Sequence, residues 1–181
     1  NPVTAISKPA SPPHRDKLLN RSEIRTVLRL LGCNADSVSS RVGLAFLFAL
    51  RTGMRAGEIC AVRRIHCHLD HVTLTLTKNG SLRHVPLSRK AKRVLRHALD
   101  LGHEPVFGLT SGTLDTLFRR ARDAAGLIDV HFHDSRHWAA TNMARKLPVV
   151  DLCRMFGWKS MSQALTYYNA SAGSIAALLD K

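Results

Sequence analysis

The sequence is short of aromatic residues, acidic residues and long apolar runs, and each shortage excludes a class of protein. Aromatic residues make up 6% of the 181 residues, and the two tyrosines are adjacent, Tyr167 and Tyr168. No apolar stretch approaches the roughly 18 residues of a membrane-spanning helix, so no membrane protein is expected. Asp and Glu number 13 against 27 Lys and Arg, giving a formal net charge of +14. Such an excess favours a polyanionic partner, most often nucleic acid, over a merely solvated basic surface.

Cysteines are few and unpaired in the sequence. The four, Cys33, Cys60, Cys67 and Cys153, form no Cys-x-x-Cys motif, which indicates reduced thiols in an intracellular protein. The run His66-Cys67-His68 suggests a metal site. In an extended stretch, however, neighbouring side chains point to alternating faces and do not converge on one ion. We therefore predict no metal site.

The first 17 residues differ in composition from the rest of the chain. They contain four prolines and few large apolar side chains, which is typical of a linker. The chain also begins at Asn1 without a methionine, so we expect a fragment or a processed product whose preceding domain is missing. Residues 18–181, in a chain with 45% hydrophobic residues, are expected to form one globular domain.

The hydrophobic pattern of residues 18–181 is mainly helical. One segment, "HVTLTLTKNGSLRHVPLS", alternates apolar and polar residues around Asn79-Gly80, which predicts a β-hairpin. The fold class is therefore α+β, mostly α-helical, with one small antiparallel sheet. Helices are predicted over residues 20–31, 41–51, 56–63, 88–101, 113–125, 134–146, 149–156, 160–168 and 171–179.

Four separated segments carry polar residues that a hydrophobic core does not need. Each alone has an ordinary explanation, such as a surface arginine, a solvated hairpin lysine or a packed tyrosine, so the information lies in their order and spacing. The segments are "TGMRAGEI" with Arg55 and Glu58, "LTKNGS" with Lys78, "HDSRHW" with His133, Arg136 and His137, and "FGWKSMSQALTYYN" with Trp158 and Tyr167.

In this order the four segments resemble the motifs of the tyrosine recombinases, the phage-integrase family of site-specific DNA recombinases. The resemblance extends from about Leu18 to the C-terminus. It implies the catalytic-domain fold of that family and an enzyme that binds DNA, cleaves it and rejoins it without a cofactor. Ser135 stands where a leucine is usual, and Trp158 stands where most members carry histidine. The proline-rich start resembles the linker that follows the family's N-terminal DNA-clamping domain.

The resemblance also implies a role for each candidate residue in a transesterification at a DNA phosphodiester. Tyr167 is the expected nucleophile, because the family's nucleophile follows the His or Trp position by nine residues. Arg55 and Arg136 are expected to hold the phosphate, since guanidinium groups donate two hydrogen bonds and stay charged. The remaining roles are Lys78 as general acid, His133 as base or hydrogen-bond partner, Trp158 as donor or packing residue, and Glu58 as supporting carboxylate.

Two residues in these motifs are assigned differently. Tyr168 is predicted to pack, since neighbours on a helix point about 100° apart and only one can face the arginines. By the same reasoning His137, which directly follows Arg136, is predicted to be structural.

Double-stranded DNA is the expected partner, and the resemblance implies a homotetramer in the complex with DNA. Whether the chain is a monomer without DNA is left open. The terminal segment "NASAGSIAALLDK" docks either on a neighbouring protomer or on its own domain. The resemblance also implies a location in the bacterial cytoplasm.

Two other functions remain open, a type IB topoisomerase-like relaxation activity and a non-catalytic basic DNA-binding module. The residues available for phosphate contacts are Arg25, Arg63, Arg64, Arg83, Arg89, Lys90, Lys92, Arg119, Arg120, Arg122 and Lys159.

Overall fold

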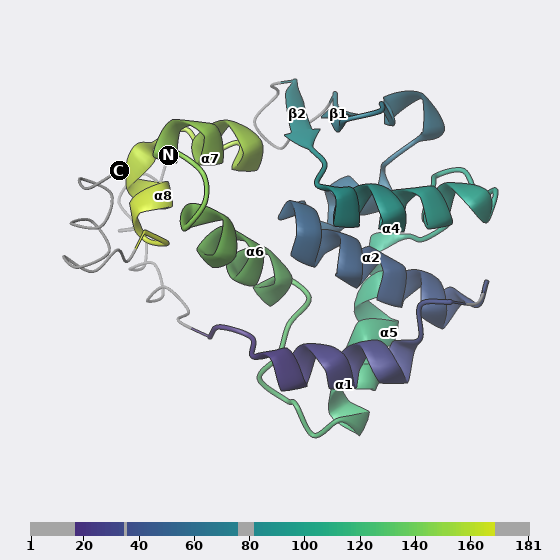
Figure 1. Cartoon of the computed structure of the whole chain (residues 1–181). Coiled ribbons are helices and arrows are strands. Elements are labelled where there is room, and N and C mark those ends of the chain that lie inside the picture. The colour runs from purple at the N-terminus through teal and green to yellow at the C-terminus, as the bar shows by residue number, and fades with distance from the viewer. Residues whose placement is uncertain (1–16, 35, 76–81, 169–181) are drawn as a thin grey trace, which may run out of the picture.

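The fold is described from a computed structural model, which covers residues 17–34, 36–75 and 82–168 (Figure 1). Most of the described residues lie in helices, and one two-stranded sheet stands at an edge of the helical body. In chain order the elements are α1 (Arg21–Leu31), α2 (Val38–Thr52), α3 (Ala56–Cys60), the 3₁₀ helix η2 (Arg64–His66), β1 (His71–Leu74), β2 (Arg83–Pro86), α4 (Arg89–Asp100), α5 (Ser111–Ala124), α6 (Asp134–Ala144), α7 (Val149–Phe156) and α8 (Met161–Leu165).

Helix α2 is the centre of the core. It begins at Ser37, whose side chain accepts a hydrogen bond from the backbone N–H of Ser40, and it ends at Gly53 in the left-handed conformation. Helices α1, α4, α5 and α6 all pack against it, so its residues are apolar around most of its circumference. Phe46 of α2 lies 5.0 Å from the Phe118 ring and 5.7 Å from the Phe132 ring, centroid to centroid.

The predicted sheet is present and small. Strands β1 and β2 pair antiparallel, with Val72 opposite Val85. Val72, Leu74 and Val85 are buried, as the alternation predicts. The expected turn at Asn79-Gly80 lies outside the described residues. The mostly helical α+β prediction with one small antiparallel sheet is confirmed.

Several element boundaries differ from the prediction. Helix α2 starts three residues earlier than expected, because Ser37 supplies the cap. Of the stretch His66–His68, which was expected to be extended, His66 ends a 3₁₀ helix, whereas Cys67 is extended and forms an isolated β-bridge with Val72. Helix α8 ends at Leu165 instead of continuing to Tyr168, and the Ser160 side chain accepts from the N–H of Ser162. The predicted helix over residues 171–179 lies outside the described residues, as does most of the predicted linker.

Two further facts bear on the class of protein. No helix of residues 17–34, 36–75 and 82–168 is long and apolar enough to cross a membrane. All four cysteines are among the described residues, and each is a free thiol.

Candidate active site

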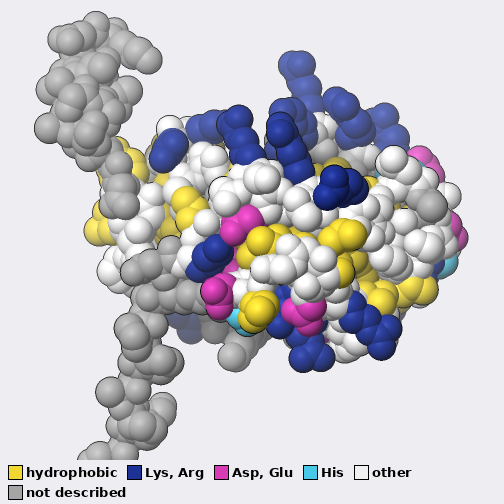
Figure 2. All heavy atoms as spheres, turned by 90° about the horizontal axis from the view of Figure 1, so that it is seen from below, with side chains coloured by type: hydrophobic (Ala, Val, Ile, Leu, Met, Phe, Trp, Pro, Cys, Tyr) yellow, Lys and Arg dark blue, Asp and Glu magenta, His cyan; other side chains and the backbone are white. Residues whose placement is uncertain are grey.

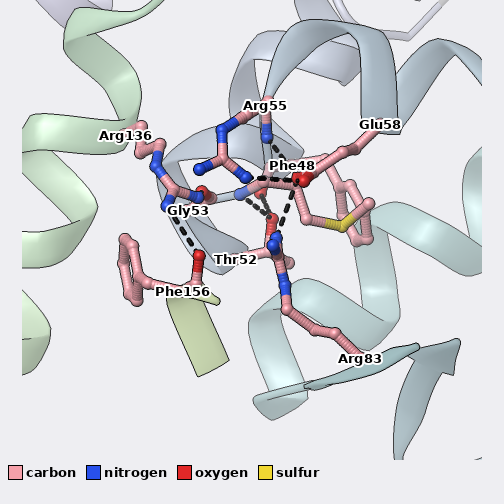
Figure 3. Close-up of polar contacts among 9 residues, drawn as sticks. Phe48, Thr52, Gly53, Arg55, Glu58, Arg83, Arg136 and Phe156 are labelled. Carbon is pink, nitrogen blue, oxygen red and sulfur yellow. Dashed lines mark hydrogen bonds and ion pairs between the residues drawn. The ribbon is translucent and has the colours of Figure 1, made fainter. Parts of the chain in front are cut away.

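Arg136 connects three of the four motif segments. Its side chain extends from α6 and is buried, at 5% exposure. The guanidinium donates through Nη1 to the carbonyl oxygen of Gly53 and through Nη2 to that of Phe156, at 2.7 Å (Figure 3). Gly53 and Phe156 each stand two residues before another candidate, Arg55 and Trp158. The arginine therefore holds the starts of two other motifs against its own helix.

Glu58 holds two more arginines beside Arg136. Its Oε1 accepts from Nη1 of Arg55 at 2.9 Å, and its Oε2 accepts from the Arg55 backbone N–H and from Nη2 of Arg83, both at 2.8 Å. In Figure 3 the Arg55 guanidinium points toward Arg136, and Arg83 reaches Glu58 from β2. Although burial alone raises the pKa of Glu58, these bonds and the charge of Arg83 hold it below its usual value. The carboxylate therefore stays ionised and fixes the direction of Arg55.

The cluster carries an excess of positive charge. Burial, and then the charges of Arg55 and Arg83, lower the pKa of Arg136 to about 9. The group is still protonated at neutral pH, so three guanidinium groups are gathered around the carboxylate of Glu58. An anion placed beside Arg55 and Arg136 relieves this repulsion, and a phosphate matches the two-pronged donors of arginine.

Tyr167 lies beside the cluster in the turn after α8. Its ring stacks on Trp158 at 5.2 Å between centroids and 3° between planes. Trp158 in turn stacks on Phe156, at 4.6 Å, and the Arg136 guanidinium carbon lies 4.7 Å from the Phe156 centroid. The structure thus joins Arg136, Trp158 and Tyr167 through a continuous set of ring contacts. Tyr168 is more exposed, at 39%.

The Tyr167 hydroxyl contacts a residue that the sequence reasoning treated as structural. Nδ1 of His137 lies 2.7 Å from the Tyr167 oxygen. His137 follows His133 by four residues, and their rings meet edge-on at 5.1 Å. His137, which was predicted to be structural, thus has a hydrogen-bond partner in the Tyr167 hydroxyl. The spacing of four residues on one helix face was the signal that sequence reasoning overlooked.

His133 stands directly before α6, without a side-chain hydrogen bond that caps the helix. Its side chain is exposed. Desolvation of the ring by the surrounding protein lowers the pKa of His133, and the charges of His137 and Arg136 lower it further. The neutral ring can accept or donate a hydrogen bond at the edge of the arginine cluster.

Lys78 is not placed by the structure, and Arg83 is buried. Lys78 lies outside the described residues, so its role stays a prediction. Arg83, counted among the arginines available to DNA, is 6% exposed and bound to Glu58. Arg83 and Val85 both lie on the buried face of β2, and the exposed His84 stands between them. The period of two in a strand could have predicted from the sequence that Arg83 is buried.

The described residues hold no metal cluster, and the groove that they form lies apart from the site. In the part of the chain that the structure describes, no group of three or more His, Cys, Asp or Glu side chains could hold a metal ion. A groove of about 1040 Å³ runs between α1, α2, α4 and α6. None of the described catalytic candidates lines it. Its basic side chains are Arg21, Arg25, Arg51, Arg89, Lys90 and Lys146.

Comparison with known proteins identifies what the chain is similar to. The sequence model of the phage integrase family matches residues 17–174. A putative integrase/recombinase of Haemophilus influenzae is 34% identical over 182 residues, which cover 93% of this chain and 49% of that protein. A shufflon-specific DNA recombinase of Escherichia coli is 34% identical over 184 residues, covering 99% of this chain and 47% of that protein. The chain thus spans about half the length of these relatives.

Solved structures with the same fold include two recombinases. A dimer of lambda integrase residues 75–356 bound to a core site superposes with a TM-score of 0.73 at 22% identity, covering 92% of this chain and 64% of that one. XerA recombinase gives a TM-score of 0.66 at 17% identity, covering 96% of this chain and 66% of that one. These superpositions confirm the fold expected from the motif order.

Proposed function

The chain belongs to the phage integrase family, and we propose that it is the catalytic part of a site-specific DNA recombinase. The Tyr167 oxygen attacks the phosphorus of a DNA phosphodiester, and the bond from phosphorus to the 5′ oxygen breaks. A 3′-phosphotyrosyl bond forms and the leaving 5′ oxygen takes up a proton. The new ester conserves the energy of the old one, so rejoining needs no nucleotide cofactor.

One observation carries this proposal. Arg55 and Arg136 are brought together, with Arg136 buried and Tyr167 connected to it through Trp158. A cluster of guanidinium groups connected to a tyrosine through Trp158 has the parts required for attack on a phosphate diester. The arginines stabilise the charge that grows on the non-bridging oxygens, as metal ions do in other phosphoryl-transfer enzymes.

The remaining residues receive supporting roles in this proposal. Glu58 fixes Arg55, and His133 contacts the phosphate or the nucleophile. Trp158 packs the tyrosine and presents an indole N–H. Lys78, on the connection between β1 and β2, protonates the leaving 5′ oxygen.

The surface charge supports DNA as the partner. Figure 2 shows Lys and Arg side chains gathered along one edge of the face that it presents, with a few acidic side chains nearer the middle. The lambda integrase structure holds a core-site DNA. We propose that this chain likewise binds a DNA duplex, in the bacterial cytoplasm. The relatives are named integrases and recombinases, which supports recombination rather than relaxation or binding alone.

We further propose that four protomers act on two duplexes. Sedimentation of the chain with its DNA site should give the mass of four protomers and two duplexes. A mass that corresponds to one protomer per duplex at saturating DNA contradicts the tetramer.

Covalent capture tests the central claim. The full chain is incubated with a library of duplexes that carry a randomised core and a nick beside each candidate phosphate. Protein that stays on DNA after denaturation is recovered and its DNA sequenced. We expect a denaturation-resistant adduct, because the fragment released at the nick diffuses away and prevents rejoining.

The two adjacent tyrosines provide a matched pair of variants. Tyr167→Phe should abolish the adduct, since the attacking oxygen is gone. Tyr168→Phe should retain it within a few-fold, because that side chain lies on the surface. An adduct formed by Tyr167→Phe overturns the assignment of the nucleophile.

A further inference from the structure

His137 contacts the proposed nucleophilic oxygen directly. Its Nδ1 lies 2.7 Å from the Tyr167 hydroxyl oxygen, which is hydrogen-bond distance. The two rings are 5.8 Å apart between centroids and tilted by 32°. The hydroxyl hydrogen can therefore be shared with the imidazole nitrogen.

Two elements fix this contact. Helix α6 presents His133 and His137 four residues apart, with their rings in edge contact at 5.1 Å. The turn after α8 presents Tyr167, whose N–H donates to the carbonyl of Ala164 at 3.0 Å. Trp158, stacked parallel to the phenol, restricts the ring further. The packing of two elements and the hydrogen bond to His137 thus orient the nucleophile.

The nucleophile needs this assistance. Burial raises the pKa of Tyr167, and the charge of Arg136 opposes the effect only in part. A neutral phenol attacks phosphorus poorly, and a hydrogen-bonded imidazole is a common means of removing the proton from an oxygen nucleophile.

We propose that His137 is the general base for Tyr167, an inference that rests on the proposed function because it concerns the same reaction. As the oxygen of Tyr167 bonds to phosphorus, its O–H bond breaks and the proton moves to Nδ1 of His137. The bond to the 5′ oxygen breaks, and that oxygen is protonated by a separate acid, which we assign to Lys78. On rejoining, the 5′ hydroxyl attacks phosphorus and returns its proton to neutral Lys78, and the His137 imidazolium returns its proton to the departing tyrosine oxygen. His133, which lies near the arginines, then contacts the phosphate.

The test separates the two proton transfers. Single-turnover adduct formation is measured on two versions of the captured site. One has the natural bridging 5′ oxygen and the other has sulfur at that position, because a thiolate leaves without protonation. The variants are His137→Asn, whose amide can occupy the position of Nδ1 but cannot take a proton, and Lys78→Ala. Thermal unfolding and DNA binding in a mobility shift establish that each variant folds and binds.

We expect His137→Asn to slow adduct formation by about 10²- to 10⁴-fold on both substrates, since the tyrosine must lose its proton in either case. Lys78→Ala should be slow with oxygen and should recover with sulfur. Rescue of His137→Asn by sulfur assigns His137 to the leaving group and overturns the proposal. A His137→Asn variant that folds, binds DNA and reacts within about threefold of the rate of the unmodified chain also overturns it.

A second variant keeps the proposal testable if asparagine disturbs the turn. In His137→Ala, free imidazole should restore adduct formation in proportion to its concentration, as a base does and a packing side chain does not. No response to imidazole contradicts the proposal. Failure of the proposed function is a different result, namely no adduct from the unmodified chain or an adduct from Tyr167→Phe.

Discussion

At the scale of single residues, Glu58 organises the arginine cluster. Its two oxygens accept from Arg55 and from Arg83, and the Arg83 guanidinium lies under Gly157, where an added Cβ would meet Nη1 at 2.6 Å. A buried carboxylate with two arginine partners resists rotation, so Arg55 is held in one direction before substrate arrives. Preorganised donors of this kind need little rearrangement during the reaction.

Arg83→Met tests this organisation. Removing Arg83 leaves Glu58 with Arg55 alone, so we expect a loss of about 1–3 kcal/mol in the free energy of unfolding, measured in urea. Adduct formation should slow as well, because Arg55 loses part of its fixed orientation. Arg89→Met is the matched control on an exposed arginine. Equal stability of the two variants would show that the Arg83 contact is unimportant.

At the scale of elements, two helix ends determine the geometry around Arg136. Helix α2 ends at Gly53 (φ 68°) and α7 ends at Gly157 (φ 65°), both in the left-handed region that favours glycine. The carbonyl of Gly53 accepts from Arg136, and a Cβ at Gly53 would overlap the ring of Phe156. Gly53 therefore ends α2 and also lets the Phe156 ring pack closely against the backbone.

Gly53→Ala should be more damaging than an ordinary glycine substitution. We expect it to cost about 1–2 kcal/mol from the left-handed backbone, plus the cost of displacing Phe156, and to slow adduct formation. Gly102→Ala is the control, since Gly102 has φ 78° and open space around its Cβ position. The difference between the two unfolding free energies, measured by chemical denaturation, isolates the packing component. No difference would mean that the contact with Phe156 relaxes freely.

At the scale of the whole molecule, charge governs binding. A net charge of +14 on 181 residues predicts affinity that depends on released counterions. Between 50 and 200 mM salt, affinity should fall by about 10³-fold if some six phosphates are contacted. Fluorescence anisotropy with a labelled duplex measures this, and the logarithm of affinity should be linear in the logarithm of salt. A flat response rules out a phosphate-dominated interface.

Some residues of the site could be chosen from the sequence, and others could not. Arg55, Arg136, Trp158 and Tyr167 were chosen from motif spacing, and the structure brings them together. His137 was predicted to be structural because it follows Arg136 on the helix, and Arg83 was one of the arginines available for phosphate contacts. The structure adds a contact of His137 with Tyr167 and one of Arg83 with Glu58, and each of these partners comes from a segment distant in the sequence.

The sequence by itself determined the helical pattern, the small sheet, the basic charge and the order of the motif residues. These follow from local periodicity, composition and spacing, which need no knowledge of distant contacts. Only the tertiary structure decided that Arg136 is held by the carbonyls of Gly53 and Phe156, and that His137 contacts Tyr167. Backbone carbonyls are present at every residue and have no sequence signature. Which of them meets a given arginine is therefore decided by the packing of α2, α6 and α7.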